Sequence, residues 1–301
     1  MHPSTNPLRP HSNPNLVMST AAPLKHFLEN PSRSVANLNY RLRESWRRQT
    51  ARVHPNPVFV FGNQKSGTSA IAALLGEATG LSYTIDILCL YEGLEERLLR
   101  GNVSFDEVLE RGRYYFSKPI IKDPGFTFFY DEIASRFPAS KRVFVLRDPR
   151  QNIRSILNRL KLPGNLDDLS NEQWQTLKQA FPGWYPILEG SLAGHQGSTY
   201  IETLALRCQK AFQLYQTHQT ELIPIHYETF SQDKAHSIYN LASQLGINVT
   251  QSIDRVKDKQ FQPKGNTDVP LRDFFGVDNL QRIEAICQSE MISMGYFPET
   301  L

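Results

Sequence analysis

Short apolar runs alternate with helical patterns along most of this chain. The runs lie at residues 58–61, 119–122, 142–146 and 221–225. A run without alternating polar positions is typical of a strand that is covered on both faces. Segments with apolar residues at helical spacing follow the first three runs, at 68–76, 126–137 and 151–160. Strands that alternate with helices in this way indicate a parallel sheet with right-handed crossovers.

The pattern therefore predicts an α/β fold with three layers, in which helices flank a parallel sheet as they do in P-loop NTPases. We expect a single domain over residues 34–301, with a helix over 34–56 leading into it. Pro224 interrupts the last apolar run and indicates an edge strand, because proline cannot donate a ladder hydrogen bond. Periodicity weakens over 161–200, where aromatic residues lie among proline and glycine. We expect this stretch to be an irregular loop region on the acceptor side of a binding site, although plain packing would explain its aromatic residues equally well.

The amino-terminal part of the chain has a different character. Residues 1–33 contain six prolines among asparagine, serine and histidine, which predicts a flexible arm. Over 35–49, apolar positions recur at helical spacing with four arginines between them. A basic amphipathic helix of this kind either packs on the main domain or touches a membrane surface or a partner through residues 35–50.

Composition narrows the class of protein. The chain has 301 residues, of which 40% are hydrophobic and 21% charged, and this argues against wholesale disorder. A net charge of +3 is too small to suggest nucleic-acid binding, so we expect no nucleic-acid partner. Cys89, Cys208 and Cys287 are widely separated and form no CxxC pair, which favours a reducing compartment. No apolar run approaches the ~20 residues of a membrane span, and we expect a cytoplasmic location.

The strongest functional signal is the segment 62–69 (GNQKSGTS), between the first strand and its helix. A glycine-containing turn that enters a helix presents backbone N–H groups at the positive end of the helix dipole, which suits an anion. Lys65 adds a positive charge. Gly62 and Gly67 match the P-loop pattern G-x-x-x-x-G-K-[ST], but Thr68 stands where that pattern has lysine. The turn therefore predicts a phosphate cradle that differs from those of standard ATPases and GTPases.

A second signal follows the strand at 142–146, where the chain reads RDPRQNIRS over 147–155. Arg147 should lie at the carboxyl edge of the sheet, where open α/β sheets bind ligands. A P-loop hydrolase would place a magnesium-binding Asp at such a strand end, whereas arginine favours direct contact with an anion. Ser155 lies about two helical turns further on. Taken alone, this segment is equally compatible with a local salt bridge and turn.

Together the two motifs resemble the sulfotransferase family. The resemblance implies that the donor is 3′-phosphoadenosine 5′-phosphosulfate (PAPS), that the product is adenosine 3′,5′-bisphosphate (PAP), and that no metal is needed. It assigns the 5′-phosphosulfate to the turn 65–69 and the 3′-phosphate to Arg147 and Ser155. The residues implied in cofactor binding are Lys65, Ser66, Gly67, Thr68, Ser69, Arg147, Ser155, Tyr227, Lys264 and Gly265.

The chain also departs from the family pattern. Pro263 stands where many members have arginine, and Ala70 where many have an aromatic residue near the adenine. Lys122 and Asp123 occupy the segment where small-molecule enzymes have Lys-x-His. Without that histidine, the pattern is closer to the bacterial and carbohydrate-type branches, in which a carboxylate can be the base.

The resemblance also implies catalytic roles. Lys65, with Lys122, would stabilise the charge that develops on the leaving oxygen. Asp123 is the first candidate for the general base, although an ion pair would explain it equally well. The other candidates for this base are Asp86, Glu92 and His195.

Two other functions remain open from the sequence. A P-loop kinase that uses ATP–Mg would have nearly the same fold. A catalytically inactive nucleotide-binding adaptor would keep the anion sites without transferring a group. If the protein is a sulfotransferase, the acceptor is a small molecule, lipid or carbohydrate that offers a hydroxyl or amine, and its identity is left open.

Overall fold

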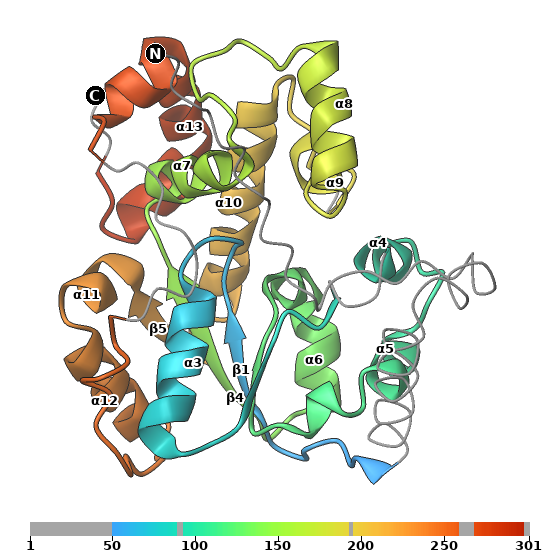
Figure 1. The fold of residues 1–301 in the computed structure, drawn as a ribbon, viewed down its shortest axis with the longest axis vertical. Coiled ribbons are helices and arrows are strands. Elements are labelled where there is room, and N and C mark those ends of the chain that lie inside the picture. Colours follow the sequence, from blue (N-terminus) through green and yellow to red (C-terminus); the bar gives the residue numbers. More distant parts are fainter. Residues whose placement is uncertain (1–49, 89–92, 193–194, 259–267, 298–301) are drawn as a thin grey trace, which may run out of the picture. The chain divides into compact units, whose positions relative to one another are not determined.

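The structure, a computed structural model, describes residues 50–88, 93–192, 195–258 and 268–297. Within the compact unit Thr50–Leu301, five strands form one parallel sheet in the order β2-β3-β1-β4-β5 (Figure 1). The strands are β1 (Val58–Phe61), β2 (Tyr83–Ile85), β3 (Ile120–Lys122), β4 (Lys141–Leu146) and β5 (Ile223–His226). The predicted α/β fold is confirmed, and so is the edge position of the strand that contains Pro224.

Helices connect and cover the strands. The α-helices are α3 (Thr68–Thr79), α4 (Leu94–Leu99), α5 (Phe105–Arg111), α6 (Tyr130–Arg136), α7 (Pro149–Leu160), α8 (Asn171–Ala180), α9 (Tyr185–Glu189), α10 (Tyr200–Thr217), α11 (Tyr227–Gln232), α12 (Lys234–Gln244) and α13 (Leu271–Ser293). Two 3₁₀ helices, η2 (Tyr115–Ser117) and η3 (Pro124–Phe129), flank β3. None of the described helices is long and apolar enough to cross a bilayer.

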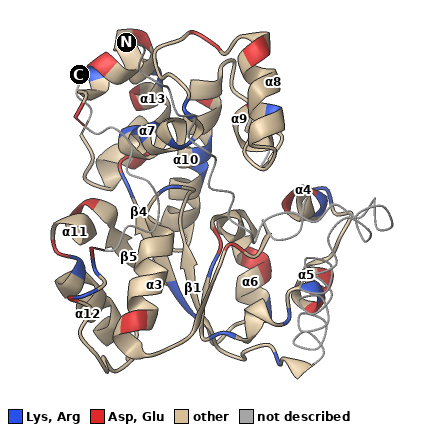
Figure 2. Ribbon diagram, in the orientation of Figure 1, with Lys and Arg blue, Asp and Glu red and all other residues tan. Residues whose placement is uncertain are grey.

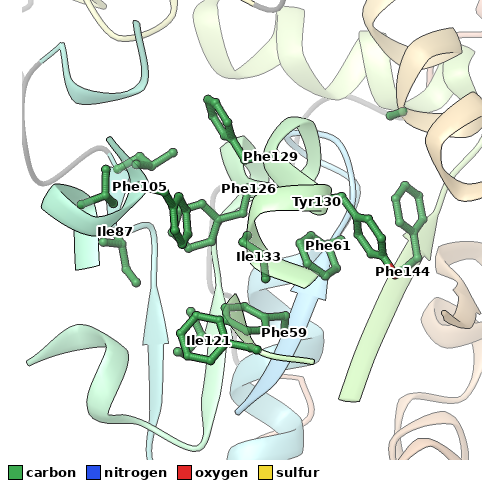
Figure 3. Packing of buried hydrophobic residues seen from close by; sticks show 14 of the residues in the cluster. Phe59, Phe61, Ile87, Phe105, Ile121, Phe126, Phe129, Tyr130, Ile133 and Phe144 are labelled. Atoms are coloured by element: carbon green, nitrogen blue, oxygen red, sulfur yellow. The ribbon is translucent and has the colours of Figure 1, made fainter. Parts of the chain in front are cut away.

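Side chains of β1 alternate between the two faces of the sheet, as the pleat requires. Val58 and Val60 pack against α3 and α12 on one face. Phe59 and Phe61 point to the other face, where they pack against aromatic residues of η3 and α6 (Figure 3). Apolar residues on both faces explain why this strand reads as an unbroken apolar run, and they produce the predicted helix–sheet–helix layers.

A second group of helices packs around α10. Apolar side chains of α7, α10 and α13, among them Ile153, Leu204 and Ile283, are buried together. In Figure 1 these helices lie above the sheet, at the end toward which the arrow of β1 points. The carboxyl-terminal ends of the strands therefore face a helical region, and the loops between the two carry the predicted site.

The sequence prediction for residues 161–200 is wrong in one respect. This stretch contains α8 and α9 in addition to loops. Helix α8 starts with a capping box formed by Ser170 and Gln173, and of its own residues only Leu177 is buried. A helix that buries so little produces hardly any periodic apolar pattern, which is why the sequence predicts an irregular stretch here.

The helix predicted over 34–56 falls largely outside the described residues, which begin at 50. Residues 51–56 are described and are not helical. They lead into β1, and the His54 backbone N–H donates to the Phe116 carbonyl at 2.8 Å. Pro55 and Pro57 account for this, because proline removes a helix donor and disfavours helical geometry at the residue before it.

The sheet order places the end of β1 at the centre of the carboxyl edge. Val60 is in register with Lys122 of β3, and Phe61 with Phe144 of β4. The chain therefore moves to one side of β1 to form β3 and to the other side to form β4. Ligands of open α/β folds bind at such a switch point.

Candidate functional site

The turn between β1 and α3 has the backbone of an anion cradle. Lys65 (φ 65°) and Gly67 (φ 102°) are both in the left-handed region, which curls the chain around the amino end of α3. No side chain caps this helix end, so its first N–H groups point outward without an intrahelical partner. Gly67 is required here, since a Cβ at this position would lie 2.3 Å from Cδ2 of Tyr227.

Buried polar side chains of α7 and η3 hold the turn in place by hydrogen bonds. Asn63 Nδ2 donates to Asn152 Oδ1 at 3.0 Å, and Asn152 Nδ2 donates to the Gln64 carbonyl at 2.8 Å. The Gly62 N–H donates to Thr127 Oγ1 at 2.9 Å. The turn is thus tied to α7 and η3 before any ligand binds, which reduces the ordering entropy that binding must overcome.

Arg147 follows β4, as predicted, and it meets this turn directly. Its Nη1 donates to the Lys65 carbonyl at 2.5 Å. Its guanidinium lies over the ring of Tyr227, with Cζ 4.1 Å from the ring centroid. The Nε of Arg147 is buried and finds no acceptor among the described residues. A buried donor without an acceptor is costly, and a bound anion is one group that would satisfy the guanidinium.

Cations converge on this edge of the sheet. Burial and the charges of Arg159, Arg147 and Lys122 lower the pKa of Lys65 from 10.5 to about 8. Figure 2 shows basic residues in the loop after β4, on α7 and on α10. Crowded like charges destabilise one another, so an anion placed among these four groups would be held strongly.

The other residues predicted to bind the cofactor differ in how the structure places them. Thr68 and Ser69 form the first turn of α3, and Tyr227 packs on Gly67 and Arg147. Ser155 is half-buried in the second turn of α7, and in the described part of the chain its hydroxyl makes no hydrogen bond. Lys264 and Gly265 lie outside the described residues.

Lys122 and Asp123 end β3 beside the cradle. The Lys122 ammonium is buried and forms an ion pair with Asp86. Both carboxyl oxygens of Asp123 accept backbone N–H groups, Oδ2 from Leu88 at 2.6 Å and Oδ1 from Gly125 at 2.9 Å. Burial, with the nearby charges of Asp86 and Glu95, raises the pKa of Asp123 to about 7. The pKa of Asp123 is therefore near neutral, but both of its carboxyl oxygens already accept hydrogen bonds from the local backbone.

A buried pair that the sequence analysis did not identify, Arg207 and Glu95, lies next to these residues. Arg207 is 1% exposed and donates from Nε to Gln64 Oε1 at 3.0 Å, while its Nη2 is 3.7 Å from Glu95 Oε1. Burial raises the pKa of Glu95, and Arg207 partly opposes this. The Glu95 carboxyl packs on the Gly125 backbone, where a Cβ would lie 3.0 Å from its Cδ. Glu95 thus contacts η3 through Gly125, and Arg207 links it to Gln64 in the cradle.

Two further candidates for the base from the sequence are Glu92 and His195. Glu92 lies outside the described residues. His195 is half-buried, and burial together with Lys210 and Arg207 lowers its pKa. The structure shows no contact between the described His195 side chain and Lys122 or Asp123. One signal for the missed pair is visible in the sequence: Arg207 interrupts the apolar stripe of α10 formed by Leu204, Cys208 and Ala211.

Comparison with known proteins adds a fold-level result. No model of a protein family and no curated protein matches this chain. Sulfotransferase STF9 from Mycobacterium avium has a similar structure, with a TM-score of 0.52 over 87% of this chain and 82% of that one, at 10% identity. This chain has the sulfotransferase fold. At 10% identity the likeness concerns the fold alone.

Other solved sulfotransferases are similar at lower TM-scores. One is the enzyme from Alicyclobacillus acidocaldarius, at 17% identity and a TM-score of 0.41, with 78% of this chain and 97% of that chain covered. Another is mouse sulfotransferase SULT7A1 in complex with PAP, at 14% identity and a TM-score of 0.46, with 81% and 88% covered.

Proposed function

We propose that this protein is a sulfotransferase that moves the sulfuryl group of PAPS to an acceptor hydroxyl or amine. The observation that carries the proposal is the contact between Arg147 and the Lys65 carbonyl at 2.5 Å. It brings together, at one switch point, the two segments that we propose to bind anions, and PAPS carries two separate anionic groups. Lys65 and the amino end of α3 suit the 5′-phosphosulfate, while Arg147 and Ser155 suit the 3′-phosphate.

Sulfuryl transfer is an in-line displacement that builds negative charge on the oxygen leaving with the nucleotide. Fixed cations aimed at that oxygen lower the barrier. Lys65 has this role in our proposal. Lys122 supports it from β3, where Asp86 holds its ammonium in place. The acceptor then loses a proton to a carboxylate of the neighbouring acidic group.

A kinase that uses ATP–Mg is the main alternative. Arg147 at the end of β4 counts against it, because a P-loop kinase or hydrolase places a metal-binding carboxylate at such a strand end. Calorimetric titrations with PAP and with ATP–Mg test the two functions. We expect PAP to bind more tightly, and clearly tighter binding of ATP–Mg would favour the kinase. An inactive adaptor would bind PAP but would transfer no radiolabelled sulfate from PAPS to any component of a cell extract.

The base is proposed from two neighbouring carboxyl groups, Asp123 and Glu95. Asp123 is the residue predicted from the sequence. Glu95 is favoured by its access, since its side chain is 19% exposed whereas Asp123 is 4% exposed. A general base must reach the acceptor hydroxyl directly or through one water, and neither oxygen of Asp123 is free of backbone donors.

We expect Glu95→Gln to lower sulfate transfer from labelled PAPS by about a hundredfold or more, which is the usual effect of losing a general base. Its amide oxygen still faces Arg207, so PAP affinity should stay close to that of the wild type. Asp123→Asn is the matched variant. It should instead lower the unfolding temperature, because its NH₂ group would face a backbone N–H. An inactive but stable Asp123→Asn protein beside an active Glu95→Gln protein would make Asp123 the base.

The lowered pKa of Lys65 predicts a pH dependence of PAP binding. In the free protein its ammonium loses its proton as pH rises through about 8, and the neutral amine attracts phosphate less. The phosphates of PAP are already ionised there, since their second pKa is about 6. Calorimetry from neutral to alkaline pH should therefore show PAP affinity falling above pH 8. Lys65→Arg should remove this fall, and a flat wild-type profile would contradict the prediction.

The acceptor and the setting of the reaction remain proposals. A small molecule, lipid or carbohydrate acceptor is compatible with the partly buried aromatic residues of α8, α9 and the loop between them. Trp174 and Tyr185 contact each other edge to face, with ring centroids 5.9 Å apart, so part of this aromatic group packs internally. A cytoplasmic location, a membrane contact through residues 35–50 and the lack of a nucleic-acid partner rest on the sequence alone.

A further inference from the structure

The backbone next to Arg147 is held by Glu228 of helix α11, which directly follows β5. The Asp148 N–H, in the peptide just after Arg147, donates to Glu228 Oε1 at 3.1 Å. Asp148 then caps α7 by accepting from the Arg150 N–H at 2.9 Å, and its carboxylate pairs with the Arg150 guanidinium at 2.7 Å. The direction in which Arg147 leaves β4 is thus set between Glu228 on one side and α7 on the other.

Glu228 is itself held from the far end of the chain. Its second oxygen, Oε2, accepts from the hydroxyl of Tyr296 at 2.8 Å. The same hydroxyl lies 3.2 Å from Nδ1 of His226. Tyr296 comes three residues after the end of α13 (Leu271–Ser293), and its N–H donates to the Met291 carbonyl at 2.8 Å. Its ring stacks on Phe212 of α10, with centroids 6.4 Å apart and planes at 12°.

The charges around the Tyr296 hydroxyl keep it a donor. Burial and the carboxylate of Glu228 raise the pKa of Tyr296 above its usual value, while Arg147 acts in the opposite direction. Burial lowers the pKa of Arg147, and the charges of Tyr227 and Glu228 oppose this. Tyr296, Glu228 and Arg147 therefore form one connected polar network whose members hold each other's position and protonation state.

We propose that Tyr296 and Glu228 are positioning residues for Arg147. The Tyr296 hydroxyl orients Glu228, Glu228 fixes the peptide after Arg147, and the guanidinium is thereby aimed at the 3′-phosphate. This inference rests on the proposed function, because it gives Arg147 the 3′-phosphate as its ligand. It gives the segment after α13 a specific task in cofactor selection, which sequence motifs around the cradle do not reveal.

The test compares PAP with 5′-AMP, which lacks the 3′-phosphate, by calorimetry on the full chain. Tyr296→Phe removes one hydroxyl and no charge. We expect it to weaken PAP binding about three- to tenfold, in the lower part of the range of couplings within one polar network, and to leave 5′-AMP binding unchanged. Tyr200→Phe is the matched control, because it removes a tyrosine hydroxyl that donates to the Pro163 carbonyl at 2.6 Å, away from Arg147. This control should change neither affinity.

A double-mutant cycle separates positioning from a general structural effect. In an Arg147→Ala background, Tyr296→Phe should no longer change PAP affinity, because the guanidinium through which Tyr296 acts is absent. If Tyr296→Phe fails to fold, Glu228→Ala replaces it. Removing the Glu228 carboxylate takes away a negative charge, which by itself would strengthen the binding of an anion. Weaker binding of PAP with unchanged binding of 5′-AMP would therefore support a positioning role.

Two results would overturn the inference: equal weakening of PAP and 5′-AMP, or an undiminished effect in the Arg147→Ala background. A wild-type protein without preference for PAP over 5′-AMP would instead refute the proposed function.

Discussion

Lys65→Ala is expected to slow sulfate transfer from PAPS at least about tenfold, because an oriented donor that faces developing charge contributes about a hundred- to a thousandfold in comparable sites. The substitution should leave the backbone of the turn unchanged. Alanine keeps a Cβ at φ 65°, so the backbone strain of the turn is unchanged. The carbonyl of residue 65 also remains available to Arg147. The measurement is the initial rate of transfer of radiolabelled sulfate at saturating PAPS.

Two matched variants separate charge from packing at this position. Lys65→Met fills a similar volume without charge and should be as slow as Lys65→Ala. Lys65→Arg keeps the charge and should retain more activity, although its planar group cannot replace a point charge fully. PAP affinity should fall less than turnover, because the interaction with Lys65 strengthens as the leaving oxygen gains charge. An unchanged rate in Lys65→Ala would show that another cation serves the leaving group.

Strong local signals explain what could be predicted from the sequence. The central strands are apolar on both faces, as Phe59 and Val60 show, so their runs were recognisable without any structure. The turn at Lys65 and the strand end at Arg147 lie next to such runs, and parallel strands bring their carboxyl ends to one edge. Short or shallowly buried elements escaped prediction. Strand β2 has three residues, and α8 buries only Leu177 of its own residues.

The missed site residues have a different cause. Arg207 reaches Gln64 across 143 positions of sequence, and Tyr296 reaches Glu228 across 68. Only tertiary packing brings such pairs together, and no spacing rule on a single strand or helix encodes them. For Asp123 the sequence suggested a role that tertiary contacts make less favourable. Its type and place beside Lys122 suggested a base, but the sequence could not show that Leu88 and Gly125 already donate to both of its oxygens.

This contrast bears on how the site works. The residues that we propose to contact an anion lie in short motifs, because one turn and one strand end suffice to present them. Residues that set geometry and protonation come from distant helices. The buried Arg207 links Glu95 to Gln64 in the cradle, so an anion bound there acts on the same network as the proposed base. Donor binding and acceptor activation would then be coupled through the side chain of Gln64.

Arg147→Ala is expected to weaken PAP binding by about 1.5–3 kcal/mol, or about ten- to a hundredfold, the value of a charge-assisted contact. The loss should be specific to the 3′-phosphate, so 5′-AMP should bind nearly as well as to the wild type. Arg147→Lys should recover only part of the affinity, because lysine cannot donate to Lys65 and to a phosphate with one planar fork.

Arg113→Ala controls for net charge in this experiment, since Arg113 pairs with Glu110 at the surface and should leave PAP affinity unchanged. Calorimetry at fixed ionic strength is the appropriate measurement, because screening weakens the interaction of every exposed charge with the nucleotide. Normal PAP binding by Arg147→Ala would show that the end of β4 does not hold the 3′-phosphate. The donor would then have to be sought among nucleotides with a single anionic group, and the kinase would become the better explanation of this fold.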